Sequence, residues 1–356
     1  MPRKTRDSGA AIGGVPAALA AALLFGAGTP LAKLLLGPVS PWMLAGILYL
    51  GSGLGLAVVR LGARRRTTGI ARNEWPWLAA AIALGGVAGP LLLMWGLARM
   101  PAAPASLLLN AEGVLTALVA WLAFRESFDR RIAFGMLLIA AGAAWLAWPP
   151  EARFEAALPA LAVLGACAAW ALDNNLTRKV ALADATQVAM LKGIVAGAVN
   201  VALASLAGSP WPAPGALASG ALLGFLSYGL SLVLFVRALR DLGTARTAAY
   251  FSTAPFAGAI ISLILLREAP TWGLAAAALL MGAGLWIHLT ERHRHLHHHE
   301  PIDHDHEHEH DQHHRHAHAE PVAPGVHHSH RHHHDAMTHS HEHYPDAHHR
   351  HHHPDS

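Results

Sequence analysis

Long apolar runs, separated by short connectors that carry Pro, Gly and charged residues, make up the chain as far as about residue 290. Each run is about 20 residues long, the length that a helix needs to cross the hydrocarbon core of a bilayer. A soluble helical protein would place polar residues at helical spacing along each run, whereas here whole runs lack charge. The pattern predicts an all-α integral membrane protein. The ten transmembrane helices expected are 12–36, 40–61, 76–98, 104–124, 131–149, 156–177, 184–206, 214–237, 246–266 and 271–289.

The fourth of these runs is repeated in the second half of the chain. Residues 107–126 read LLLNAEGVLTALVAWLAFRE, and residues 249–268 read AYFSTAPFAGAIISLILLRE, so that Glu126 aligns with Glu268. Internal repeats decide a fold more firmly than local propensity does. Because the unit contains five spans, an odd number, the second copy enters the membrane from the other side, and the sequence predicts an inverted 5+5 repeat. The two repeats are expected over 12–149 and 156–289.

The distribution of charge separates the membrane region from the end of the chain and orients it. Up to residue 290 the chain holds 21 Lys and Arg against 11 Asp and Glu, and beyond it 5 against 12. The basic residues lie in short loops rather than on one face, so no nucleic-acid partner is expected. With the N-terminus in the cytoplasm, 16 of them fall on the cytoplasmic side and 4 on the other, where Lys33 is expected to reach the outer interface. A multi-pass protein of the cell inner (plasma) membrane is therefore predicted, with residues 1–11 and 290–356 in the cytoplasm.

Paired Arg-Glu residues close the fourth and ninth spans, and each pair follows a helix rich in small residues and precedes a Gly-rich one. The stretch WALDNNLTRK over 170–179 and its first-half counterpart FGAGTPLAK over 25–33 form a second motif. With these motifs, the chain over roughly 12–290 resembles the drug/metabolite transporter superfamily, in the branch built from two EamA domains. The resemblance implies a ten-helix inner-membrane carrier, often an exporter of amino acids, metabolites or toxic compounds, and it does not define the substrate.

Ionisable residues inside a span are costly to bury and are candidates for function. Glu112 lies about 12 Å inside the fourth span, counting about 1.5 Å per residue from Pro104, and Lys192 lies at a similar depth in the seventh. Two hypotheses follow for Glu112, namely a charge pair with Lys192 across the repeats or a proton-carrying group. The alternative for both residues is a structural ion pair or hydrogen bond that fixes helix packing.

Further polar and aromatic residues are candidates for the substrate pathway. Asp173, Asn174 and Asn175 form a polar step toward the cytoplasmic end of the sixth span, and in lipid such a step has to face protein or a cavity. Asn110 and its repeat partner Ser252 are expected to line a central cavity, with ordinary packing as the alternative. The complete predicted pathway, which has no catalytic residue, is Trp95, Asn110, Glu112, Asp173, Asn174, Asn175, Lys192, Tyr228, Tyr250 and Ser252.

The end of the chain is poor in apolar residues and rich in histidine. Residues 293–353 contain 27 of the 28 histidines, in alternating runs such as HDHEHEHDQHHRHAH at 304–318 and HSHEH at 339–343. Because no apolar core can form, disorder is expected over 290–356. Imidazole with nearby carboxylates binds Zn²⁺, Ni²⁺ or Co²⁺, although a pH-responsive polyelectrolyte or a low-complexity tail with incidental affinity would have the same composition. The predicted metal ligands are His304, His306, His308, His310, His313, His314, His316, His318, His339, His341 and His343.

Three functions are compatible with this sequence. The first is a secondary transporter that exports a small metabolite or drug-like solute by alternating access. The second is a carrier of Zn²⁺, Ni²⁺ or Co²⁺ that uses the tail, and the third is a membrane receptor or scaffold. Because the spans contain few transition-metal ligands, the first is favoured. No P-loop or nucleophile motif is present, so neither an enzyme nor a required cofactor is expected. The expected partners are a small-molecule substrate and the lipid bilayer, and a homodimer stays open.

Overall fold

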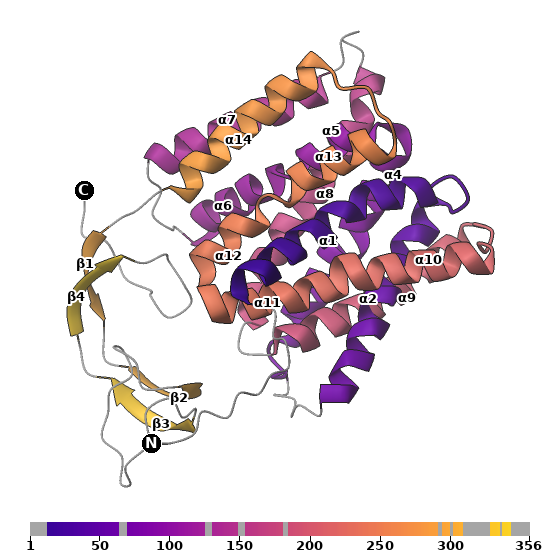
Figure 1. The fold of residues 1–356 in the computed structure, drawn as a ribbon. Helices are drawn as coiled ribbons and strands as arrows, with labels where there is room; N and C mark the ends of the chain where they lie inside the picture. The colour runs from indigo at the N-terminus through magenta and orange to yellow at the C-terminus, as the bar shows by residue number, and fades with distance from the viewer. Residues whose placement is uncertain are drawn as a thin grey trace, which may run out of the picture. The chain divides into compact units, whose positions relative to one another are not determined.

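The computed structural model describes residues 13–63, 70–124, 130–148, 154–180, 184–290, 294–299, 302–308, 328–334 and 337–342. The chain divides into two compact units, Met1–Thr290 and Glu291–Ser356. The described part of the first unit is helical and contains both repeats, and the second unit is the histidine-rich tail (Figure 1).

Two of the helical rods in the first repeat are interrupted. The third rod passes from α3 through a π-helical segment, η1, into α4, and the fourth is broken at Leu109 and Asn110 between α5 and α6. The elements are α1 (Gly14–Leu35), α2 (Pro41–Ala63), α3 (Trp75–Ala81), η1 (Ile82–Ala88), α4 (Gly89–Arg99), α5 (Ala102–Leu108), α6 (Ala111–Phe124) and α7 (Arg130–Ala147).

The second repeat has the same interruptions in the same order. Its third rod again contains a π-helical segment, η3, and its fourth is broken at Ser252 and Thr253. This correspondence agrees with the repeat predicted from the sequence. The elements are α8 (Phe154–Thr177), the short 3₁₀ helix η2 (Arg178–Val180), α9 (Ala185–Leu206), α10 (Pro214–Gly224), η3 (Phe225–Leu230), α11 (Ser231–Leu242), α12 (Thr244–Phe251), α13 (Ala254–Leu265) and α14 (Trp272–Leu289).

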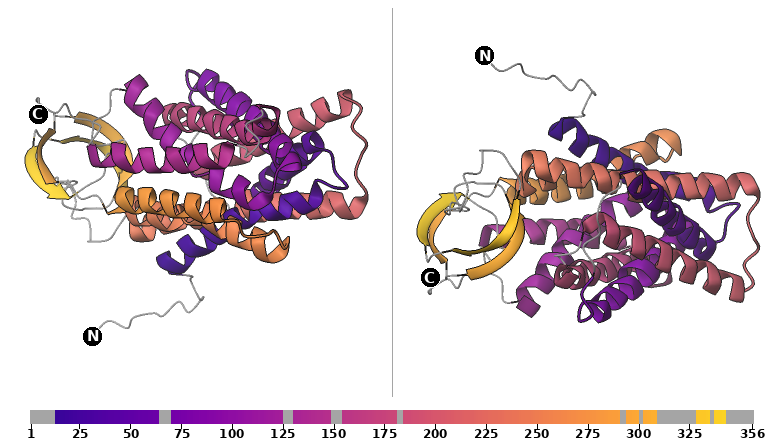
Figure 2. Two further views of the ribbon diagram at one scale, coloured as in Figure 1. Left: turned by 90° about the horizontal axis from the view of Figure 1, so that it is seen from above. Right: turned by 90° about the horizontal axis from the view of Figure 1, so that it is seen from below.

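The two repeats are packed into each other rather than side by side. Helix α1 packs against α11 and α13 of the second repeat, and its counterpart α8 packs against α4 and α6 of the first. The matched helices α2 and α9 also meet, so closely that a Cβ atom on Gly193 would lie 2.7 Å from the Cα of Gly53. Small residues allow such backbone contact between helices in lipid. Along one flank, α7 and α14 form a separate pair (Figures 1 and 2).

Most of the predicted spans are present as long apolar helices. Among the described residues, eight helical segments are long and apolar enough to cross a membrane, and the segments Arg131–Ala147 and Trp272–Ile287 are apolar but shorter. Large apolar side chains cover the outside of the helical unit, and Trp272 is 92% exposed. An apolar surface of this kind is typical of a protein solvated by lipid. The fold is therefore that of a helical membrane protein, and the count of ten spans stays a prediction.

The structure describes four short segments of the tail as strands, and the disorder expected over 290–356 stays a prediction. These are β1 (Arg294–His299), β2 (Ile302–His308), β3 (His328–His334) and β4 (Met337–Glu342). Strand β1 pairs antiparallel with β4, and β2 pairs antiparallel with β3. The lack of apolar residues argues against a packed core, and a two-stranded ladder without an apolar face is at most marginally stable in water.

Asp184 caps the N-terminus of α9 just before the span Ala185–Leu206. Its carboxylate accepts hydrogen bonds from the backbone N–H groups of Thr186 (2.8 Å) and Gln187 (3.1 Å) and lies 3.2 Å from the guanidinium of Arg60 on α2. Partial burial acts to raise the pKa of Asp184, but the hydrogen bonds and the charge of Arg60 outweigh it, so the pKa lies below its ordinary value of 3.8. This carboxylate therefore stabilises the folded state above its unfolded pKa, and the contribution is lost as the pH falls through the folded value.

Asp184→Ala is expected to lower the free energy of unfolding near neutral pH by about 1 kcal/mol, the usual effect of losing an N-cap. Thermal unfolding in detergent between about pH 7 and about pH 3 checks this. The difference from wild type should be constant near neutrality and should shrink below about pH 4, where the wild-type carboxylate begins to be protonated. Asp184→Asn, which keeps a cap acceptor, should lose less. A difference that stays the same down to about pH 3 would contradict the assignment.

Candidate functional site

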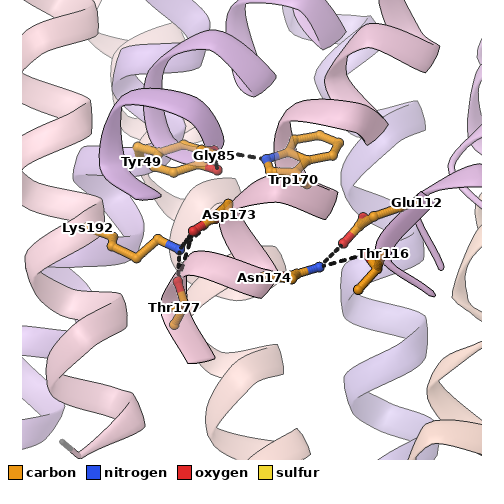
Figure 3. Close-up of polar contacts among 9 residues, drawn as sticks. All are labelled: Tyr49, Gly85, Glu112, Thr116, Trp170, Asp173, Asn174, Thr177 and Lys192. Carbon is orange, nitrogen blue, oxygen red and sulfur yellow. Dashed lines mark hydrogen bonds and ion pairs between the residues drawn. The ribbon is translucent and has the colours of Figure 1, made fainter. Parts of the chain in front are cut away.

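A buried ion pair links helix α8 to helix α9. The ammonium of Lys192 lies 2.5 and 2.6 Å from the two carboxylate oxygens of Asp173 (Figure 3). One turn further along α8, the hydroxyl of Thr177 donates a hydrogen bond to Asp173 (2.9 Å) and accepts one from Lys192 (3.4 Å). The Asp173 side chain is only 7% exposed and that of Lys192 is 17% exposed, so the pair is largely removed from solvent. Removing either partner would leave a buried charge without its counter-ion.

A second polar contact joins α8 to α6. The amide of Asn174 donates to the carboxyl group of Glu112 (3.0 Å) and lies 3.4 Å from the hydroxyl of Thr116, one turn further along α6 (Figure 3). The amide of Asn175 donates to the backbone carbonyls of Thr116 (3.2 Å) and Ala171 (2.8 Å). Asp173 and Lys192 lie close enough to Glu112 to interact with it electrostatically. The two contacts therefore form one cluster in which a single ammonium group faces two carboxyl groups.

The π-helical segment η1 closes one side of this cluster. The carbonyl of Gly85 accepts hydrogen bonds from the hydroxyl of Tyr49 and from the indole N–H of Trp170, both at 2.9 Å (Figure 3). In a π-helix this carbonyl would bond to the N–H five residues later, but that residue is Pro90, which has none. A Cβ atom on Gly85 would lie only 1.9 Å from an Asp173 oxygen. Glycine is therefore required here for the ion pair to fit.

A row of aromatic rings extends from the cluster along the contact between the repeats. Tyr49 packs on Tyr228 with ring centroids 5.9 Å apart, and Tyr228 packs edge-to-face on Phe25 at 6.0 Å. Phe25 in turn lies 5.2 Å from Phe251. Aromatic pairs at these distances add rigidity and offer apolar surface beside polar groups. The arrangement places aromatic, largely apolar surface next to the polar cluster.

Comparison with known sequences identifies the family of this chain. The model of the EamA-like transporter family matches residues 12–148 and residues 157–290, which are the two repeats. The chain belongs to the EamA-like transporter family. This EamA-like protein is therefore a membrane transporter, as its motifs indicated.

Two curated relatives share sequence with this EamA-like transporter. An uncharacterized transporter of Methanothermobacter thermautotrophicus is 29% identical over 270 residues, which cover 70% of this chain and 78% of the relative. A probable 4-amino-4-deoxy-L-arabinose-phosphoundecaprenol flippase subunit, ArnE, of Pseudomonas paraeruginosa is 47% identical over 76 residues. That second match covers 21% of this chain and 63% of the flippase subunit. Both relatives carry names of membrane transport proteins.

A solved structure shows the same fold. A protein known by its crystal structure superposes with a TM-score of 0.57 at 19% sequence identity, and the match covers 77% of this chain and 96% of the other. The arrangement of helices in the EamA-like transporter is thus shared with an experimentally determined structure.

The structure brings together Glu112, Asp173, Asn174, Asn175 and Lys192 from the predicted pathway, with Tyr228 in the adjoining aromatic row. The proposed pairing of Glu112 with Lys192 is wrong. Lys192 bonds to Asp173 instead, because α8 and α9 both pack against η1 and the long Lys192 side chain reaches Asp173 from there, whereas Glu112 on α6 meets Asn174.

Four predicted pathway residues lie outside the cluster. Trp95 lines a separate apolar groove, where the guanidinium of Arg99 stacks 4.1 Å from its ring. The amide of Asn110 donates to the carbonyl of Leu107 (3.0 Å), Ser252 donates to its own helix, and Tyr250 packs on the buried residues at the start of α1. The place of these four residues on the substrate pathway stays a prediction.

The metal ligands predicted in the tail are only partly described. Strand β2 contains His304, His306 and His308, and β4 contains His339 and His341. In the described part of the chain, no group of three or more His, Cys, Asp or Glu is arranged to hold a metal ion. The remaining predicted ligands lie outside the described residues and are His310, His313, His314, His316, His318 and His343.

Sequence reasoning missed several members of the cluster. Thr116 follows Glu112 by four residues, and Thr177 follows Asp173 by four, so each hydroxyl lies one helical turn from a carboxylate. This spacing was visible in the sequence and could have indicated both residues. Tyr49 gave no such signal, because only the packing of α2 against η1 brings its hydroxyl to Gly85.

Proposed function

We propose that this protein is a secondary transporter that exports a small organic solute by alternating access between its two repeats. The observation that carries the proposal is the cluster of Glu112, Asn174, Asp173 and Lys192, in which side chains from α6 of the first repeat and from α8 and α9 of the second are joined. Charged side chains inside spans are expensive and are retained for ion or substrate pathways. In the proposed arrangement ten spans cross the inner (plasma) membrane, and both termini lie in the cytoplasm.

The position of Glu112 supports a role at the centre of the pathway. Glu112 lies near the middle of the candidate span Ala102–Ala123. Its partner Asn174 belongs to the span Phe154–Val180 and is exposed, although its neighbours Asp173 and Asn175 are buried. An exposed amide at membrane depth has to face water or protein, since lipid cannot satisfy its hydrogen bonds. Asn174 and Glu112 therefore face the route along which the solute crosses.

The charges of the cluster indicate which solutes it would accept. Lys192 is neutralised by Asp173, so the carboxyl group of Glu112 remains as the group that gains and loses charge. An amine-bearing solute would match this carboxylate, with the nearby aromatic rings covering its apolar part. The name of the flippase subunit similar to this chain also denotes an amino compound. In the proposed cycle a proton and the solute bind Glu112 in turn, which couples export to the proton gradient.

The second candidate function is transport of Zn²⁺, Ni²⁺ or Co²⁺, and it depends on the tail. The observation that favours it is the concentration of 27 histidines in residues 293–353. In this alternative the tail would load or sense the ion at the cytoplasmic face. A homodimer would be compatible with either function.

Growth of a deletion strain that carries either the full-length protein or residues 1–290 separates the two functions. The panel contains Zn²⁺, Ni²⁺, Co²⁺, amino acids and toxic amine analogues. Equal resistance to an organic solute with both forms is the expected result, because the helical unit alone contains the cluster. Metal tolerance that requires the full-length protein would instead favour the metal carrier and overturn the proposed export of an organic solute.

A further inference from the structure

Two charged side chains from distant parts of the sequence hold the turn between α4 and α5. The ammonium of Lys33, on α1, donates hydrogen bonds to the backbone carbonyls of Leu97 (2.6 Å) and Met100 (3.0 Å), where α4 ends. The carboxylate of Glu268, in the loop after α13, accepts hydrogen bonds from the backbone N–H groups of Ala102 (2.6 Å) and Ala103 (2.8 Å), where α5 begins. Lys33 therefore caps the C-terminal end of α4, and its position at the outer interface stays a prediction.

The two charges match the helix ends that they contact. The last carbonyls of a helix carry partial negative charge, and its first N–H groups carry partial positive charge. Lys33 thus meets the negative end of α4, and Glu268 meets the positive end of α5. Lys33 and Glu268 also interact electrostatically with each other. The result is a contact that joins α1, the α4–α5 turn and the second repeat.

The backbone beside Glu268 is in an unusual conformation. Arg267 has a φ of 54°, and among the described residues it is the one non-glycine residue with positive φ. This region is unfavourable for residues with a Cβ atom, so the surrounding contacts have to maintain it. Turning the chain at Arg267 directs the carboxylate of Glu268 across to the other repeat. The Arg267-Glu268 copy of the Arg-Glu motif therefore has a structural role in joining the two repeats.

The end of the fold that contains this contact is closed. Helix α5 packs against α13, and a Cβ atom on Gly258 would lie 3.0 Å from the hydroxyl oxygen of Ser106 and 2.7 Å from the carbonyl oxygen of Gly26. Ser106 is only 1% exposed. Its hydroxyl has no hydrogen-bond partner within the described part of the chain. Solvent is excluded from this position by the close packing of the α5 and α13 backbones.

The matched end of the fold differs. In the internal repeat, α12 corresponds to α5 and α6 corresponds to α13. The counterpart of the α5–α13 contact would therefore join α12 to α6, but the described residues of these two helices make no comparable contact. Ala248, which aligns with the buried Ser106, is exposed. The two ends of the fold are equivalent by sequence, but the α5–α13 end is closed and the α6–α12 end is separated. A transporter that alternates between two such states needs contacts that form at one end and release at the other.

We infer that Lys33 and Glu268 are gating residues, which hold the α5–α13 end closed and release it once in each transport cycle. The inference rests on the proposed alternating access and adds the contact that controls it. In the proposed orientation, this end faces away from the cytoplasm. The aligned Glu126 of the first repeat lies outside the described residues, so the inference concerns the second repeat alone.

Accessibility of a cysteine at position 106 tests the inference. Ser106→Cys is introduced into the full-length protein, and its reaction with a membrane-impermeant maleimide is followed in right-side-out and inside-out vesicles. Glu268→Gln should raise the labelling rate about tenfold, because a neutral amide loses the charge-assisted bonds to α5. Lys33→Met should act in the same direction, and Lys33→Arg should restore slow labelling. The protein with Ser106 intact measures any reaction of the buried Cys167.

Thr271→Ala is the matched control. Thr271 caps α14 by accepting a hydrogen bond from the N–H of Leu274 (3.1 Å), so its loss weakens a helix end within one repeat without a cross-repeat contact. Labelling that stays slow in Glu268→Gln, or rises equally in Thr271→Ala, overturns the gate. If the raised labelling of position 106 occurs from the cytoplasmic side, the gating role is supported and the proposed orientation is refuted. Because the assay needs no solute, failure of the proposed cargo leaves this result intact.

Discussion

Glu112→Gln is expected to reduce transport by about tenfold to a hundredfold and to remove its dependence on pH. The carboxyl group accepts a hydrogen bond from Asn174 and faces the proposed pathway, and a hydrogen bond to a charged group contributes about 1.5–3 kcal/mol. In affinity this range corresponds to the expected loss. Gln keeps the size of the side chain but cannot exchange a proton, so coupling to the proton gradient should fail while the fold is retained.

Solute export from vesicles over a range of pH measures this effect. Glu155→Gln, an exposed substitution in the first turn of α8, is the control and should behave as wild type. Thermal unfolding of both variants in detergent shows that the fold is intact. Export by Glu112→Gln at the wild-type rate and with the wild-type pH profile would show that Glu112 neither carries protons nor binds the solute.

Asp173→Asn and Lys192→Met are each expected to destabilise the folded protein by about 3–5 kcal/mol. Either change leaves one buried charge beside the hydroxyl of Thr177 without the counter-ion that is bonded to it, and this is the costly outcome for a buried ion pair. The double variant removes both charges together. It should therefore be closer to wild type than either single variant, as replacement of a complete buried pair is often neutral.

Unfolding midpoints of the four proteins in one detergent form a double-mutant cycle that tests this. The expected coupling energy is above about 3 kcal/mol, because each single change costs about 3–5 kcal/mol and the double variant should cost less than either. Additive losses would mean that the charges do not stabilise each other in the membrane. Transport by the double variant is a separate readout, and its recovery would assign the pair a structural role only.

Much of the helical architecture could be predicted because lipid imposes a simple rule on sequence. A span has to be about 20 apolar residues long, so the runs were visible without knowledge of packing. The repeat could be predicted because Arg125-Glu126 and Arg267-Glu268 follow similar helices at matching positions. The two shorter helices, Arg131–Ala147 and Trp272–Ile287, show where length alone ceases to identify a span.

The partners within the site could not be predicted, because they depend on how far each helix is rotated about its axis. Depth along the span suggested that Glu112 and Lys192 were neighbours, but depth does not show which way a side chain points. Asp173 and Asn174 are adjacent in sequence and point to different helices, one to α9 and one to α6. The capping role of Glu268 was hidden for the same reason, since Ala102 is brought to it only by the packing of the repeats.

The matching π-helical segments carry information about how the protein arose. A π-helical turn accommodates one residue more than the α-helix around it, and removing that residue would rotate everything beyond it by about 100°. Segments η1 and η3 end at Ala88 and Leu230, which the alignment of Leu107 with Ala249 places at the same position. An insertion acquired after the gene duplicated would be present in one copy. Its presence in both copies indicates that the five-helix unit already contained the bulge before it was duplicated.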